Sequence, residues 1–143
     1  MSTWREAISI DVLNHDSRAC LPGFLGIEMR ELKQNTLYSR MSIRHIPMAI
    51  NGFLHAASVV ALADTTCGNA TMAHLPTGAQ GFTTIERKSN HLGTATKGGI
   101  ACIATAPHLG RTSQVWDAVV TDEATGKKIA LFRCTQMILW PKA

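Results

Sequence analysis

The segment between His55 and His74 carries one formal charge, Asp64, and otherwise consists of small, apolar or uncharged polar residues. Pro76 and Gly78 follow it, and both favour the end of a helix. We therefore predict a helix over residues 56–73 that is apolar nearly all round. At about 100° per residue it has two sides: Val59, Leu62, Ala70 and Ala73 on one, and Ala57, Val60, Asp64, Cys67 and Gly68 on the other. A sheet is expected on the first side, and a partner subunit or a ligand on the second.

Asp64 is the first candidate for chemistry. A carboxylate on an apolar helix face is costly unless it is paired or hydrogen-bonded, and catalysis is one reason to keep it there. The alternative is that Asp64 caps a helix that restarts after a kink, and this segment leaves the two interpretations open. Cys67 lies one turn further on, where a buried small side chain is favoured over a thiol nucleophile.

His55 precedes the expected helix start. Unpaired backbone N–H groups and the positive end of the helix dipole lie there, so this position suits an oxyanion. For the His55 side chain, a capping or loop-orienting role is favoured over direct proton transfer.

The remaining segments predict an α+β fold with a mainly antiparallel sheet. The capping-box spacing of residues 3–6 predicts a helix over about residues 4–14, within an N-terminal helical segment 1–20 that Pro22-Gly23 ends. Turn-prone residues 33–35 separate two strand-like runs, 26–32 and 36–43, as in a hairpin. Four further strands are expected over residues 81–90, 99–107, 112–121 and 127–139. Residues 1–143 are expected to form a single domain.

Composition narrows the function classes. The net charge of +4 comes from scattered basic residues, which favours a small phosphorylated ligand over a nucleic acid. No apolar stretch is suited to a membrane span and no signal peptide is visible, so the cytoplasm is the expected location. The four cysteines stand far apart and lack metal-ligand spacing, so we expect reduced thiols, no metal and no cofactor.

Three motifs resemble the hotdog-fold acyl-CoA thioesterases. Residues 52–57 (GFLHAA) followed by 61–64 (ALAD) are similar to the family signature G-x-x-H-G-G…L-A-[D/E]. Residues 89–95 (SNHLGTA) are similar to its N-[F/H]-L segment, and residues 108–112 with Val115-Trp116 continue the likeness. The resemblance is closest to the phenylacetate-pathway, 1,4-dihydroxy-2-naphthoyl-CoA and Arthrobacter-type 4-hydroxybenzoyl-CoA thioesterases.

The resemblance implies a curved antiparallel sheet wrapped around one long central helix, and two copies joined into a continuous sheet, often as a dimer of dimers. It also implies hydrolysis of an acyl-CoA, with Asp64 as nucleophile or general base and the backbone N–H of Ala56 as oxyanion donor. CoA would arrive as part of the substrate. Arg111 is the best candidate for a phosphate contact. The expected CoA-binding residues are Asn90, His91, Leu92 and Gly93, and His108, Arg111, Thr112 and Ser113.

Three positions depart from the family pattern. The paired glycines are Ala56 and Ala57 here, and the polar residue six positions before the histidine is Ala49, for which Asn51 is a possible substitute. The hydroxyl found in some relatives one turn after the acid is absent, because Gly68 occupies that place. These losses keep two alternatives open, a non-hydrolytic acyl-CoA-binding protein and a hotdog dehydratase or hydratase.

The distance between the two main candidates predicts an assembly. Ala56 and Asp64 are eight residues apart on one helix, which is about 12 Å along its axis. An oxyanion donor and an attacking group must each lie about 3 Å from the reacting atoms. We therefore expect an obligate homodimer with shared sites, in which an antiparallel partner helix supplies its own Asp64.

Overall fold

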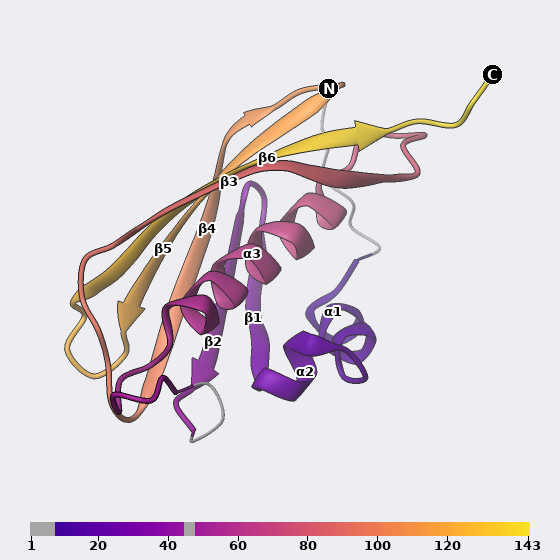
Figure 1. The fold of residues 1–143 in the computed structure, drawn as a ribbon. Coiled ribbons are helices and arrows are strands. Elements are labelled where there is room, and N and C mark those ends of the chain that lie inside the picture. The colour runs from indigo at the N-terminus through magenta and orange to yellow at the C-terminus, as the bar shows by residue number, and fades with distance from the viewer. Residues whose placement is uncertain (1–7, 45–47) are drawn as a thin grey trace.

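The computed structural model describes residues 8–44 and 48–143, which form a curved six-stranded sheet and three helices (Figure 1). Every neighbouring pair of strands is antiparallel, in the order β1-β2-β4-β5-β6-β3, so β1 and β3 are the two edges. The elements are α1 (Ile10–Ser17), α2 (Leu21–Leu25), β1 (Ile27–Lys33), β2 (Thr36–Ser42), α3 (Ala56–Ala73), β3 (Gly81–His91), β4 (Gly99–Leu109), β5 (Ser113–Asp122) and β6 (Lys128–Leu139).

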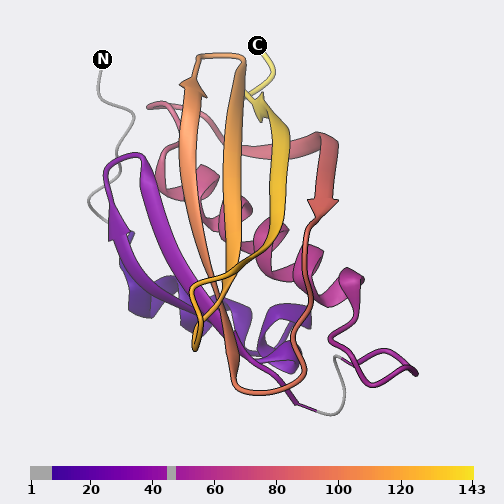
Figure 2. The ribbon, with the colours of Figure 1, turned by 90° about the vertical axis from the view of Figure 1, so that its left-hand side faces the viewer.

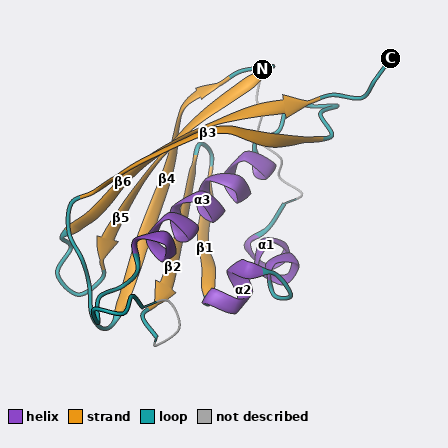
Figure 3. Cartoon of the chain, viewed as in Figure 1, coloured by secondary structure: helices purple, strands orange, loops and turns teal. Residues whose placement is uncertain are grey.

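The sheet wraps around α3, as the resemblance implied. Figure 2 shows the sheet in front and α3 behind it, and Figure 3 shows α1 and α2 below the same side of the sheet. The predicted helix over 56–73 is confirmed with the same bounds, and each of the six predicted strands is present within two residues of its expected ends. The α+β fold with one long central helix is therefore confirmed.

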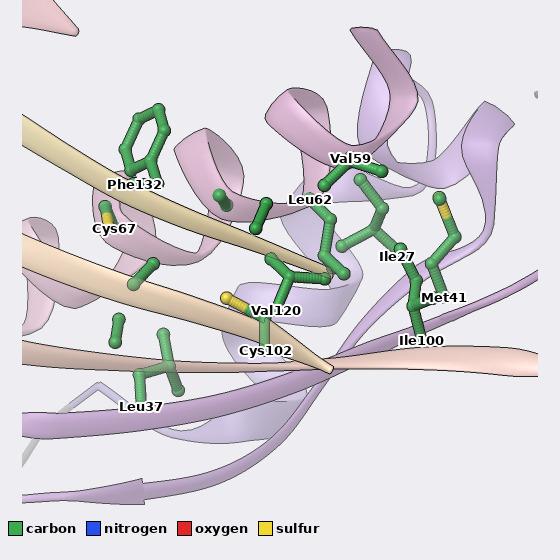
Figure 4. Packing of buried hydrophobic residues seen from close by; sticks show 14 of the residues in the cluster. Ile27, Leu37, Met41, Val59, Leu62, Cys67, Ile100, Cys102, Val120 and Phe132 are labelled. Carbon is green, nitrogen blue, oxygen red and sulfur yellow. The ribbon is translucent and has the colours of Figure 1, made fainter. Parts of the chain in front are cut away.

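The core lies between α3 and the concave face of the sheet. Buried and partly exposed residues alternate along β5, which places Trp116, Ala118 and Val120 on the inner face. Figure 4 shows side chains of α3 and of the strands meeting in this layer. The expected sheet-facing residues of α3, Val59, Leu62, Ala70 and Ala73, are all buried.

The other side of α3 is only partly open. Ala57 is exposed and Val60, Asp64 and Gly68 are half-buried, but Cys67 is fully buried. Its expected place on the uncovered side is wrong because the sheet curves around the helix, so that β6 covers Cys67 with Cys134. The covered arc of α3 is therefore wider than one flat face would give.

The N-terminal helices differ from the expectation. The described part of α1 begins at Ile10, where Ser9 is the N-cap and its hydroxyl accepts from the Val12 N–H at 3.3 Å. Residues 3–6, the predicted capping box, lie outside the described residues. Pro22-Gly23 does not end the helical region, because proline lacks the N–H that would be unpaired in a first turn and so begins α2. Gly26, with a φ of 75°, ends that helix instead.

A buried hydrogen-bonded network joins the end of α3 to the sheet. The Asn35 N–H donates to His74 Nε2 (2.8 Å), so Nδ1 carries the proton and donates to the Ala70 carbonyl (2.7 Å). The Gln114 side chain donates to the His74 carbonyl (2.8 Å) and accepts from the Trp116 ring N–H (2.9 Å). Burial lowers the pKa of His74 below its ordinary value, which suits a neutral ring with one donor and one acceptor.

Candidate functional site

The first turn of α3 presents a backbone donor to its surroundings. His55 is the N-cap, and its Nδ1 accepts from the Ala57 N–H at 2.9 Å. The His55 carbonyl accepts from the N–H groups of Ser58 and Val59 (2.9 and 3.3 Å). The Ala56 N–H donates to no other residue in the described parts of the chain. This group is therefore the donor that remains for a ligand at the positive end of the helix.

A pocket of about 430 Å³ opens at this helix start. The segment after β3 lies beside it because the N–H groups of Leu92 and Gly93 donate to the Ile129 carbonyl, and the Leu54 N–H donates to the Ala95 carbonyl. The structure thus brings together five of the residues predicted from the sequence: Asn51, His55, Ala56, His91 and Gly93 all line this pocket.

Ala49 also lines the pocket and contributes no polar side chain to it. Its own backbone pairs with Phe53, whose carbonyl accepts from the Ala49 N–H at 2.7 Å. Asn51 Oδ1 accepts from the Phe53 N–H (3.2 Å), while the Asn51 amide nitrogen has no hydrogen-bond partner in residues 8–44 and 48–143. Asn51 is therefore the residue of this loop with a side-chain donor available to a pocket ligand.

Asp64 lies in the middle of α3, about 12 Å along the axis from Ala56, and does not line this pocket. The helix is continuous from Ala56 to Ala73, so the alternative in which Asp64 caps a restarted helix is wrong. Its side chain is 30% exposed, and Arg87 Nε donates to Oδ1 at 2.7 Å. No sequence pattern indicates this ion pair, because Arg87 and Lys88 are recognisable only as neighbouring basic residues.

Cys67 and the other core thiols are poor candidates for chemistry. Cys67 is fully buried, and a hydrogen bond with Cys134, together with burial, raises the pKa of its thiol. Burial likewise raises the pKa of Cys102 to about 12. The described cysteines are all free, and no group of three or more possible metal ligands lies together among the described residues. Cys67 thus stays a protonated packing residue.

The second predicted CoA-binding segment lies at the opposite end of the sheet. Arg111 and Thr112 lie in the turn between β4, which contains His108, and β5, which begins at Ser113. The Thr112 carbonyl accepts from the Ile138 N–H at 3.0 Å. Along β6, Ile138 is nine residues from Ile129, which is about 30 Å of extended strand. One subunit therefore cannot place Arg111 in the pocket at the start of α3.

Arg111 is nevertheless held in a defined place. Its guanidinium lies 4.6 Å from the centre of the Trp140 ring, and the Trp140 ring N–H donates to the Arg111 carbonyl at 3.0 Å. Two residues of the first predicted CoA-binding segment lie outside the pocket at the start of α3: Leu92 is 57% exposed, and Asn90 lines a separate pocket of about 330 Å³ with Asp117 and Arg133.

The sequence of this chain is similar to those of known thioesterases. A profile of the Thioesterase superfamily matches residues 51–129. This range contains the start of α3, where the pocket opens, and also Asp64, Arg87 and Arg111. The 1,4-dihydroxy-2-naphthoyl-CoA hydrolase of Escherichia coli is 28% identical over 136 residues, covering 95% of this chain and 98% of that protein. No helix in the described parts has the length and apolarity needed to cross a membrane.

Two solved structures match over nearly the whole chain. A mutant thioesterase from Pseudomonas aeruginosa has a TM-score of 0.90 at 28% identity, covering 96% of this chain and 99% of that one. A thioesterase from Haemophilus influenzae has a TM-score of 0.89 at 27% identity, covering 96% of this chain and 94% of that one.

Proposed function

The chain belongs to the thioesterase superfamily and is a thioester hydrolase with the hotdog fold, and we propose that it hydrolyses acyl-CoA thioesters to a free acid and CoA. One observation supports this proposal. The backbone N–H of Ala56, at the start of α3, faces a pocket and has no partner among the described residues, and the one charged side chain of α3, Asp64, lies two turns further on. Thioester hydrolysis is accelerated by an oxyanion donor and by a nucleophile or base, and a backbone N–H and a carboxylate can supply these two functions.

In the proposed mechanism the Ala56 N–H donates to the thioester carbonyl oxygen and stabilises the negative charge that develops on it. Asp64 then acts by one of two routes. As a nucleophile, its oxygen bonds to the carbonyl carbon, the C–S bond breaks, CoA leaves as a thiolate, and water hydrolyses the resulting anhydride. As a general base, it takes a proton from the water that attacks the carbon. The tetrahedral intermediate then collapses, the C–S bond breaks, and the CoA thiolate leaves and takes up that proton. Neither route uses a metal or a cofactor.

The two groups are proposed to come from different subunits. Ala56 and Asp64 of one subunit are about 12 Å apart along the helix axis, which is too far for both to contact the same carbonyl group. β3 is an edge strand, and its outer side is unpaired among the described residues. If two β3 strands pair antiparallel, the two α3 helices run side by side in opposite directions. The small residues on the open side of α3, Ala57, Ala61 and Gly68, permit close approach.

The same pairing supports the two expected CoA-binding segments. Gly81, at the start of β3, pairs with Leu139, near the Arg111 turn, whereas His91, at its end, lines the pocket. Antiparallel pairing of two β3 strands places the start of one beside the end of the other. We propose that Arg111 of the partner subunit contacts the CoA phosphates while Asn90, His91, Leu92 and Gly93 lie along the pantetheine arm. The dimer of dimers and the cytoplasmic location stay predictions.

Release of free thiol from a panel of acyl-CoAs tests this function. We expect thiol release with at least one acyl class, and the names of the relatives favour hydrolysis over the dehydratase and binding-protein alternatives. A dehydratase or a binding protein leaves the thioester intact. Intact thioesters across short, branched, aromatic and long acyl groups, with protein that is folded and dimeric, would contradict the proposal.

A further inference from the structure

Strand β3 contains a bulge just before the residue that contacts Asp64. Thr84 pairs with Gln136, but the next residue of β6, Thr135, pairs with Glu86, so Ile85 is an extra residue with no opposite partner. A bulge of this kind changes which side chains face each side of a sheet, and bulges are frequent beside active sites.

The bulge decides which charge faces the helix. Thr84 pairs with Gln136, a buried residue on the inner face, so regular alternation would turn Glu86 inward and Arg87 outward. Because Ile85 is left out of the strand pairing, Arg87 pairs with the buried Cys134 and points toward α3. The bulge at Ile85 therefore places Arg87 beside Asp64, where regular pairing would have placed the carboxylate of Glu86.

The contact holds only one of the two carboxylate oxygens. Arg87 Nε donates to Asp64 Oδ1 at 2.7 Å, and in residues 8–44 and 48–143 no donor contacts Oδ2. The Arg87 side chain is 53% exposed, and ion pairs this exposed contribute little to stability. The pair is therefore better explained by what it does to the carboxylate than by its contribution to folding.

We propose that Arg87 is a positioning residue: it fixes the Asp64 carboxylate through Oδ1 and leaves Oδ2 as the oxygen that reacts with carbon or with water. This inference rests on the proposed function of Asp64. A carboxylate that can rotate presents its reactive oxygen in the right direction for only part of the time, and small misplacements at a reacting group cost large factors in rate.

Three variants of β3 test the inference. Arg87→Leu removes the donor, and we expect kcat for thiol release to fall about 10- to 100-fold while KM stays within about twofold. Arg87→Lys keeps a cationic donor and should recover a large part of the lost kcat. Lys88→Leu is the matched control, because it removes the same charge from the adjacent residue, which lies in register with Arg133 on the outer face, and should leave kcat unchanged. Wild-type kcat in Arg87→Leu would overturn the proposal.

A double-mutant cycle separates positioning from a general structural effect. In the Asp64→Asn background, Arg87→Leu should cost no further activity, because the group that it positions is already lost. An equal additional loss in that background would contradict the proposal.

Carboxyl ¹³C NMR keeps this inference distinct from the proposed function. The Asp64 signal, assigned by its disappearance in Asp64→Asn, should shift in Arg87→Leu and not in Lys88→Leu. If the wild-type protein hydrolysed no acyl-CoA, the proposed function would fail, and an Asp64 signal unaffected by Arg87→Leu would then overturn the positioning contact as well.

Discussion

In the proposed mechanism Asp64 is the residue on which the chemistry depends, since its electron pair would reach either the thioester carbon or a water proton. We predict that Asp64→Asn lowers kcat for thiol release by about 10²- to 10⁴-fold, because the amide has the shape of the carboxylate but lacks its negative oxygen. Fold and assembly should survive, as judged by circular dichroism and sedimentation. Full turnover by this variant on a good substrate would remove Asp64 from the mechanism.

Cys67→Ala is the control for that experiment. The thiol is buried against Cys134 and its raised pKa keeps it protonated, so its loss should lower the melting temperature slightly and leave kcat unchanged. Loss of activity in Cys67→Ala at a temperature where the protein is folded would point to a thiol nucleophile instead.

Arg111 is proposed to act in substrate binding rather than in the chemical step. A phosphate contact far from the carbonyl acts equally on the ground state and the transition state, so Arg111→Ala should raise KM for an acyl-CoA about tenfold or more and leave kcat nearly unchanged. The matching N-acetylcysteamine thioester has no phosphate, and its KM should not respond to the substitution. An equal rise in both KM values would show that Arg111 contacts some other part of the substrate.

At the scale of helices and strands, the network around His74 links α3 to the sheet and should make stability depend on pH. Burial lowers the pKa of His74 below its ordinary value of 6.5, opposed by the bond to the Ala70 carbonyl, so below pH 6.5 the unfolded chain binds more protons than the folded one. The contribution of His74 is therefore full above pH 6.5 and declines as the pH falls below it.

We predict that the melting temperature falls between about pH 7.5 and about pH 5.5, and that His74→Gln shows a smaller fall, because glutamine offers a donor and an acceptor but does not titrate in this range. Thermal denaturation of both proteins at the two values measures this difference. Identical shifts in the two proteins would mean that other groups cause the pH dependence.

Most elements could be predicted because their signals are local. A single charge in an apolar segment followed by Pro76 and Gly78 defines α3, and alternation defines the strands. The capping-box spacing at residues 3–6 predicts a helix over about residues 4–14, whereas α1 runs from Ile10 to Ser17 and its N-cap is Ser9. Pro22-Gly23 predicts the end of the helical region, but the first turn of a helix also accepts proline, and Pro22 lies in the first turn of α2.

The site was less predictable, because its geometry depends on pairing between distant strands. The motifs indicated Asp64, His55 and Ala56, but Arg87 faces Asp64 only through the bulge at Ile85, and strand register cannot be read from β3 alone. The inward position of Cys67 depends on the curvature of the sheet. The separation between Arg111 and the pocket depends on which residues of β6 each segment pairs with.

At the scale of the whole molecule, the proposed shared site makes activity depend on assembly. We predict that sedimentation shows a dimer and that specific activity falls on dilution below the dimer dissociation constant, because Ala56 and Asp64 of one subunit cannot reach the same carbonyl. Constant specific activity in a sample that sediments as a monomer would contradict the shared site.

In a single subunit, β3 is an exposed edge of the sheet. β3 is 11 residues long and carries Ile85, which is 59% exposed. In the proposed dimer, only the β3 strand of the partner subunit would cover this edge. Such an edge is a template for indiscriminate strand addition and aggregation. Selection against aggregation and selection for catalysis would thus act on the same backbone hydrogen bonds, those between the β3 strands of the two subunits. Variants that weaken this pairing should precipitate on expression, even though every side chain of the site is unchanged.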